Sequence, residues 1–115
     1  MLAQIYSLKG QKKIEDILKN GRKVQSENFG VFFRKREDLD IPKFAFVVSK
    51  KISRLAINRN RVKRAMSESV RRNIGIIPVG LDFVLLAKKS IVSKSTDEIM
   101  KEVQEFFINF KNNYK

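Results

Sequence analysis

The stretch FAFVVSKKISRLAINRNRVKRAMSESVRRN, residues 44–73, decides how this chain folds. It opens on FAFVVS, an apolar run short enough for a buried β-strand, and this strand leads into the basic pair Lys50 and Lys51. Residues 58–73 then show apolar side chains at helical spacing, and Gly75 and Pro78 prevent the helix from continuing. A buried strand, a basic loop and a basic helix therefore form the centre of the predicted fold.

The flanking sequence supplies the other elements. Residues 8–20 predict a helix that ends at Gly21, and a last helix opens at Ser95, which has capping-box spacing to Glu98. Strands are expected at residues 24–26, 29–35 and 81–88, with a turn at 36–42. The order α-β-β-β-α-β-α predicts an α+β fold, a single-domain α-β sandwich over residues 1–115 with helices packed on a small sheet.

The charge of the chain indicates a polyanionic partner. Its 115 residues carry 25 Lys and Arg against 12 Asp and Glu, a formal net charge of +13. A compact state repels itself at that charge, so nucleic acid or an anionic membrane surface is the natural partner. Cys and His are absent, which removes disulfides, thiolate metal sites and the commonest general base. We find no signal peptide or membrane-spanning run and expect a cytoplasmic protein.

The positive charge is concentrated on the central helix and the loop before it, where Glu68 is the single acid among residues 50–72. A helical wheel places an apolar stripe on one side and a polar row on the other. The stripe is Val62, Ala65, Met66 and Val70, and the row is Asn60, Arg64, Ser67 and Arg71. Because guanidinium binds phosphate through two parallel hydrogen bonds, we interpret the polar row as a nucleic-acid site rather than an ordinary solvated face.

These residues resemble a known signature. Residues 49–52 (SKKI), Ala56 and residues 58–64 (NRNRVKR) resemble the strand end and basic helix of bacterial ribonuclease P proteins. Residues 8–21 resemble the first helix of that family, residues 29–33 its aromatic strand and residues 82–88 (DFVLLAK) its last strand. The resemblance extends over nearly the whole chain.

The resemblance implies a protein subunit that binds a large catalytic RNA and the 5′ leader of precursor tRNA. It would assist Mg²⁺-dependent endonucleolytic removal of the leader. The RNA would bind most of the Mg²⁺ and supply the chemistry, so no catalytic residue is expected in the protein, and neither DNA nor a membrane is expected as a partner. The implied fold is similar to the second domain of a small-subunit ribosomal protein, with a left-handed β-α-β crossover against the usual right-handed rule.

The resemblance also implies which residues bind. Those matching the RNA-binding motif are Lys50, Lys51, Arg54, Arg59, Asn60, Arg61, Lys63, Arg64 and Arg71. Those matching the leader-binding cleft are Ile14, Leu18, Phe32 and Arg34. Ile14 and Leu18 stand where the family often has aromatic residues, and Ser67 stands where it often has a basic one. Alternation places Phe32 on the opposite face of its strand from Phe29, Val31 and Phe33, and a strand Phe is also an ordinary core residue.

Three other functions compete. A structural RNA-binding protein of the ribosomal type would share the composition and the basic helix, and only the order of the motifs separates the two. A nuclease acting alone needs converging carboxylates around divalent ions, whereas the densest acidic cluster, Glu37, Asp38 and Asp40, is expected in a solvated turn. A membrane-surface helix would carry aromatic anchors, which the apolar stripe lacks.

Overall fold

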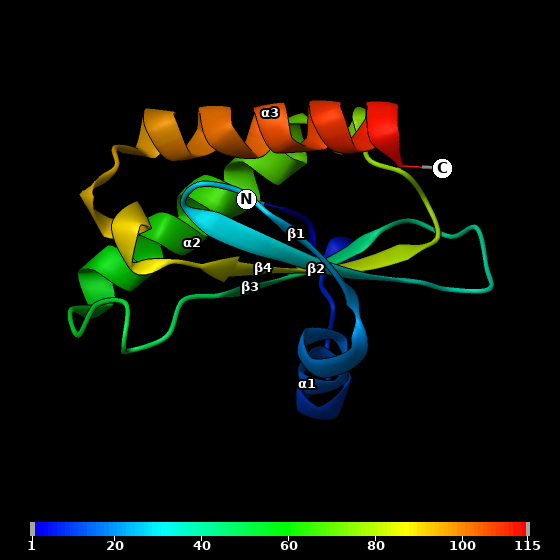
Figure 1. Ribbon diagram of the computed structural model, residues 1–115, viewed down its shortest axis with the longest axis horizontal. Helices are drawn as coiled ribbons and strands as arrows, with labels where there is room; N and C mark the ends of the chain where they lie inside the picture. Colours follow the sequence, from blue (N-terminus) through cyan, green and yellow to red (C-terminus); the bar gives the residue numbers. More distant parts are fainter. Residues whose placement is uncertain (1, 115) are drawn as a thin grey trace.

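The computed structural model describes residues 2–114 and shows a four-stranded mixed sheet with helices on both faces (Figure 1). The strands are β1 (Arg22–Gln25), β2 (Phe29–Lys35), β3 (Lys43–Val47) and β4 (Leu81–Ala87), in the spatial order β1-β2-β4-β3. β4 pairs antiparallel with β2 and parallel with β3. The helices are α1 (Gln11–Asn20), α2 (Ala56–Arg72) and α3 (Thr96–Asn113). The predicted class and order are confirmed, with short 3₁₀ turns added at Gln4–Tyr6, Ile74–Ile76 and Lys89–Ser93.

α2 and α3 cover one face of the sheet and enclose the larger core (Figure 1). The apolar stripe predicted for α2 is buried there, as are the apolar positions of α3. Phenylalanine rings fill the space between, for example Phe83 and Phe107, whose centroids lie 5.5 Å apart in an edge-to-face arrangement. The capping box is confirmed, because the Glu98 amide donates to Ser95 Oγ at 3.1 Å and the Ser95 amide donates to Glu98 Oε1 at 3.0 Å. The basic helix is therefore fixed to the sheet through its apolar side.

α1 lies on the opposite face and covers a smaller core (Figure 1). That core consists of Leu8, Ile17, Phe32, Ala45 and Val84, with Ile14 and Leu18 of α1 packed against it. The alternation predicted for β2 is confirmed, because Phe29, Val31 and Phe33 belong to the larger core and Phe32 to the smaller one.

Element boundaries differ from expectation at the first helix. α1 begins at Gln11 rather than at residue 8, because Gly10 has φ 104° and breaks the helical path. Leu8 instead donates its backbone N–H to the carbonyl oxygen of Phe44 at 2.8 Å, and Ser7 forms a parallel bridge with Phe44. The segment before α1 thus runs along the outer edge of β3. The other shifts are small: α2 begins two residues early, at Ala56, and β1 covers Arg22–Gln25.

Two further features position the binding surfaces. α2 connects β3 to its parallel neighbour β4, which is the predicted β-α-β crossover, and its left-handedness stays a prediction. β1 is the opposite edge of the sheet, and all four of its residues, including Arg22 and Lys23, are exposed. Within residues 2–114 no helix is both long and apolar enough to cross a membrane.

Candidate nucleic-acid interface

α2 and the loop before it present a set of exposed cations to solvent. The set, called the free cations below, is Lys50, Lys51, Arg54, Lys63 and Arg64, and all five are exposed. Within residues 2–114 none of these side chains makes a hydrogen bond or an ion pair, and the same is true of the exposed Asn60 amide. Asn60, Lys63 and Arg64 are held in place because Val62, Ala65 and Met66 anchor their helix in the core. These groups are available to the phosphates of a nucleic acid.

Two arginines of the predicted motif are already bound to the protein. Arg59 Nη1 donates to the carbonyl oxygens of Ser53 and Arg54, both at 2.9 Å. Arg61 donates through Nη1 to the carbonyl oxygen of Lys94 and through Nη2 to that of Val92, both at 2.8 Å. Arg59 therefore braces the basic loop, and Arg61 braces the 3₁₀ turn before α3. Sequence spacing cannot reveal such contacts, because the acceptors are backbone atoms, up to 33 residues away.

The polar row predicted on α2 holds in part. Arg64 and Arg71 are exposed, but Ser67 is 9% exposed, so its placement on the solvent side is wrong. The cause is the edge of β3 and the segment before α1, which lie beside this side of α2: Ser67 shares a hollow with Phe44 and Phe46. Arg71 is hydrogen-bonded to Glu68, and this contact holds the pKa of the Glu68 carboxyl below its usual value.

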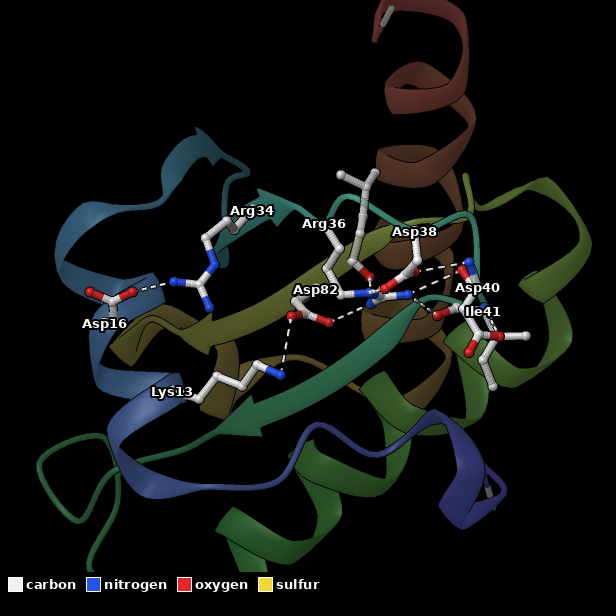
Figure 2. A network of polar contacts seen from close by, with 9 residues as sticks. Lys13, Asp16, Arg34, Arg36, Asp38, Asp40, Ile41 and Asp82 are labelled. Atoms are coloured by element: carbon white, nitrogen blue, oxygen red, sulfur yellow. Dashed lines mark hydrogen bonds and ion pairs between the residues drawn. The ribbon is translucent and has the colours of Figure 1, made fainter.

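The residues expected in the leader cleft lie on the α1 face of the sheet. Ile14 and Leu18 are half-buried against the cluster that contains Phe32. Phe32 itself is 8% exposed, and Lys23 Nζ lies over its ring, 5.2 Å from the centroid. Arg34 forms an ion pair with Asp16 of α1 (Figure 2), so it ties the helix to β2. The structure brings the four together, with the Phe32 ring largely covered.

A buried carboxylate on the same face was not predicted as a site. Asp82 is fully buried, and Arg36 Nη1 lies 2.5 Å from its Oδ1 (Figure 2). The other oxygen, Oδ2, has no hydrogen bond within residues 2–114 and faces Lys13 Nζ of α1 at 3.8 Å. The signal available in the sequence was an ionisable residue directly before the apolar run FVLLA, residues 83–87. Asp82 thus joins α1, β4 and the loop that follows β2.

Arg36 also orders the acidic loop that follows β2. Its guanidinium donates to the carboxylate of Asp38 at 3.1 Å and to the carbonyl oxygen of Ile41 at 2.7 Å (Figure 2). The backbone N–H of Asp40 and then Arg36 hold the pKa of the Asp38 carboxyl below its usual value. The predicted turn is therefore a loop fixed by one arginine, with the carboxylates of Asp38 and Asp40 engaged by groups of the same loop.

The fold and the free cations define this chain as an α+β protein with an exposed surface suited to RNA. The model of the family Ribonuclease P matches residues 2–111. The chain therefore belongs to the ribonuclease P protein family, as the basic motif predicted. Members of this family are protein components of an endoribonuclease complex that processes tRNA, and the reaction depends on Mg²⁺.

Individual relatives agree with this assignment. The ribonuclease P protein component of Thermotoga maritima is 41% identical over 75 residues, which span 65% of this chain and 62% of that protein. The protein from Macrococcus caseolyticus is 30% identical over 103 residues, 90% of this chain and 88% of its own. The solved structure of the Thermotoga maritima RNase P protein has a TM-score of 0.78 at 29% identity, covering 90% of this chain and 96% of that one. The Staphylococcus aureus RNase P protein, at 24% identity and a TM-score of 0.82, shows the same fold.

Proposed function

We propose that this chain is the protein subunit of a cytoplasmic ribonuclease P. It binds the catalytic RNA and the 5′ leader of precursor tRNA, and so assists removal of the leader at the mature 5′ end. The observation that carries the proposal is the set of five free cations on α2 and its preceding loop. Cations that have no partner among residues 2–114, on an anchored helix or in the loop before it, are available to phosphates.

In this proposal the two faces of the sheet bind different RNAs. The free cations and Asn60 bind the catalytic RNA, while Arg59, Arg61 and Arg71 support them through their contacts inside the chain. The α1 face binds the single-stranded leader through Ile14, Leu18, Phe32 and Arg34. Lys23, which lies over the largely covered Phe32 ring, adds a cation to this surface.

Mg²⁺ belongs to the RNA in this proposal. Within residues 2–114 there is no group of three carboxylate or histidine side chains that could hold a metal ion. The nearest approach to a carboxylate cluster, the loop at residues 37–40, has its Asp38 carboxylate turned to Arg36, and Asp82 is also bound by Arg36. These residues do not fit a protein-held Mg²⁺, and we assign them no step in the reaction.

Reconstitution tests the proposal. The chain alone should leave precursor tRNA intact in Mg²⁺, and with a ribonuclease P RNA it should give cleavage at the mature 5′ end at lower Mg²⁺ than the RNA needs by itself. The double variant Lys63→Gln, Arg64→Gln should lose this help. A matched variant with the same loss of charge on exposed positions of α3, Lys101→Gln with Lys111→Gln, should keep it. Cleavage by the protein alone, or equal loss in both double variants, would contradict the proposal.

A further inference from the structure

A hollow of about 610 Å³ lies where the outer edge of β3 meets α2 and the segment before α1. We call it the edge hollow. Its lining includes Ile14, Phe46, Asn60, Lys63, Arg64 and Ser67. Its volume falls within the range of roughly 300–1,000 Å³ that is usual for small-ligand sites. The hollow touches both proposed RNA surfaces, because Lys63 and Arg64 belong to the free cations and Ile14 belongs to the α1 face.

The polar lining of the edge hollow is cationic and neutral. Among residues 2–114 no acidic residue lines it, whereas the hollow between β1 and α3 includes Glu102 and Glu105. Lys63 and Arg64 supply two positive charges that are unpaired within the described part of the chain. Asn60 presents an amide that can both donate and accept hydrogen bonds. This combination favours an anionic ligand that also carries hydrogen-bonding edges.

An aromatic ring forms part of the wall. Phe44 and Phe46 lie nearly parallel, with their planes 12° apart and their centroids separated by 6.4 Å. Phe44 is buried, at 1% exposed, whereas Phe46 is only half-buried. Phe46 therefore offers ring surface to the hollow, and a planar ligand can lie against it.

The backbone of β3 supplies a further recognition element. Successive residues of a strand direct their backbone N–H and C=O groups alternately to its two edges, so the backbone groups of Phe46 point to the same edge as those of Phe44. The Phe44 carbonyl oxygen accepts from the Leu8 N–H at 2.8 Å, and the bridge on this edge joins Ser7 to Phe44. Two residues further on, the N–H and C=O of Phe46 reach the edge beyond that bridge. They can pair with the edge of a base.

From these observations we propose that the edge hollow binds one unpaired nucleotide. Its base lies against the Phe46 ring, with its edge on the Phe46 backbone and the Asn60 amide, and its phosphate contacts Lys63 and Arg64. The inference rests on the proposed function, because that function supplies RNA to this surface. The nucleotide comes from either the leader or the catalytic RNA, whose chemistry is the same.

Titration of the full chain, labelled with ¹⁵N, tests the hollow without any other subunit. The probes are the four nucleoside 5′-monophosphates, with ribose 5-phosphate and inorganic phosphate as base-free controls. Nucleotides should shift the amide signals of Ser7, Phe46 and Ser67. At least one should bind roughly 5- to 150-fold more tightly than ribose 5-phosphate, the gain expected from stacking one base on an aromatic ring. Equal affinities, or shifts confined to other residues, would overturn the proposal.

A substitution that fills the edge hollow can be compared with a matched substitution elsewhere. Ser67→Leu adds apolar volume inside the lining without changing the charge, and Gln104→Leu makes the same kind of change on an exposed position of α3. Ser67→Leu should remove the advantage of a nucleotide over ribose 5-phosphate, and Gln104→Leu should keep it. A folded Ser67→Leu protein that keeps the advantage would overturn the site. If this variant does not fold, the titration of the unaltered chain still decides.

The source of the nucleotide is found by crosslinking in the assembled complex. The photoreactive residue p-benzoylphenylalanine replaces Phe46, and the complex is formed with ribonuclease P RNA and precursor tRNA. Adducts to the leader or to the catalytic RNA would support the proposal and name the source. Absence of RNA adducts, when the same residue at Lys51 gives them, would overturn it. Failure of the unaltered protein to assist cleavage would instead count against the proposed function, because the titration needs no RNA subunit.

Discussion

The guanidinium of Arg61 and the backbone carbonyl of Lys94 are joined by a hydrogen bond of 2.8 Å. Because a second bond reaches Val92, the substitution Arg61→Lys loses a two-pronged contact that one ammonium group cannot reproduce. We expect the free energy of unfolding to fall by about 1–3 kcal/mol in urea denaturation. Arg64→Lys, which keeps a free positive charge, should leave stability unchanged. Equal stabilities of the two variants would show that the tie to Lys94 contributes nothing.

The affinity for the catalytic RNA should depend strongly on salt. If the five free cations each neutralise one phosphate, the logarithm of the affinity should fall against the logarithm of salt concentration with a slope of roughly −4. Arg64→Ala should reduce the magnitude of that slope by about 1. Filter binding or fluorescence anisotropy over a range of KCl concentrations measures both slopes. A nearly flat response would contradict an electrostatic interface.

Phe32 allows packing to be separated from leader binding. The residue is 8% exposed, so Phe32→Ala should destabilise the fold by about 3–5 kcal/mol. Phe32→Leu retains most of the apolar volume but removes the flat ring. In the assembled enzyme, we expect Phe32→Leu to weaken binding of precursor tRNA more than binding of mature tRNA. The same loss for both RNAs would assign the ring to core packing.

Asp82 should matter more for stability than any exposed carboxylate. Asp82→Asn removes the charge that Arg36 contacts in a fully buried position, and breaking a buried ion pair costs about 3–5 kcal/mol. Denaturant titration measures the loss. Asp38→Asn, an exposed partner of the same arginine, is the control and should cost much less. If Asp82→Asn left the free energy of unfolding unchanged, Arg36 would be held by its carbonyl contacts alone.

The capping box of α3 should make part of the stability depend on pH in the acid range. Hydrogen bonds from the backbone and then the side chain of Ser95 hold the pKa of the Glu98 carboxyl below its usual value. A depressed pKa in the folded state means that the contribution is present above the unfolded-state pKa and is lost as pH falls through the folded-state pKa. The difference in melting temperature between the unaltered chain and Glu98→Gln should therefore shrink below about pH 4. A melting-temperature difference that does not change with pH would contradict a role for the ionised Glu98 carboxylate in the capping box.

The elements whose signals are local could be predicted from the sequence. Helix α3 with its Ser95 cap, strand β2 with its alternating faces and the apolar stripe of α2 all follow from periods and caps within one segment. Contacts between distant segments could not be predicted in this way. Leu8 lies outside α1 because it pairs with Phe44 on the edge of β3. Ser67 is buried because the edge of β3 lies beside α2.

The same distinction applies to the candidate site. The location of the basic surface was visible in the sequence, because charge on one helix face is a local pattern. The sequence could not show which of these cations are available to RNA. Arg59 and Arg61 look the same as Arg64 in the sequence and differ from it only in their carbonyl partners. The role of Asp82 depends equally on Arg36, which lies 46 residues away.

The exposed, charged edge strand β1 also bears on how copies of the chain behave together. A sheet edge invites another strand to add to it, and repulsion between like charges is one way in which proteins resist this. Arg22 and Lys23 on β1 place positive charge on that edge. Two copies approaching edge to edge would meet the same sign of charge. The surplus that attracts a polyanion thus also discourages aggregation before the RNA is bound.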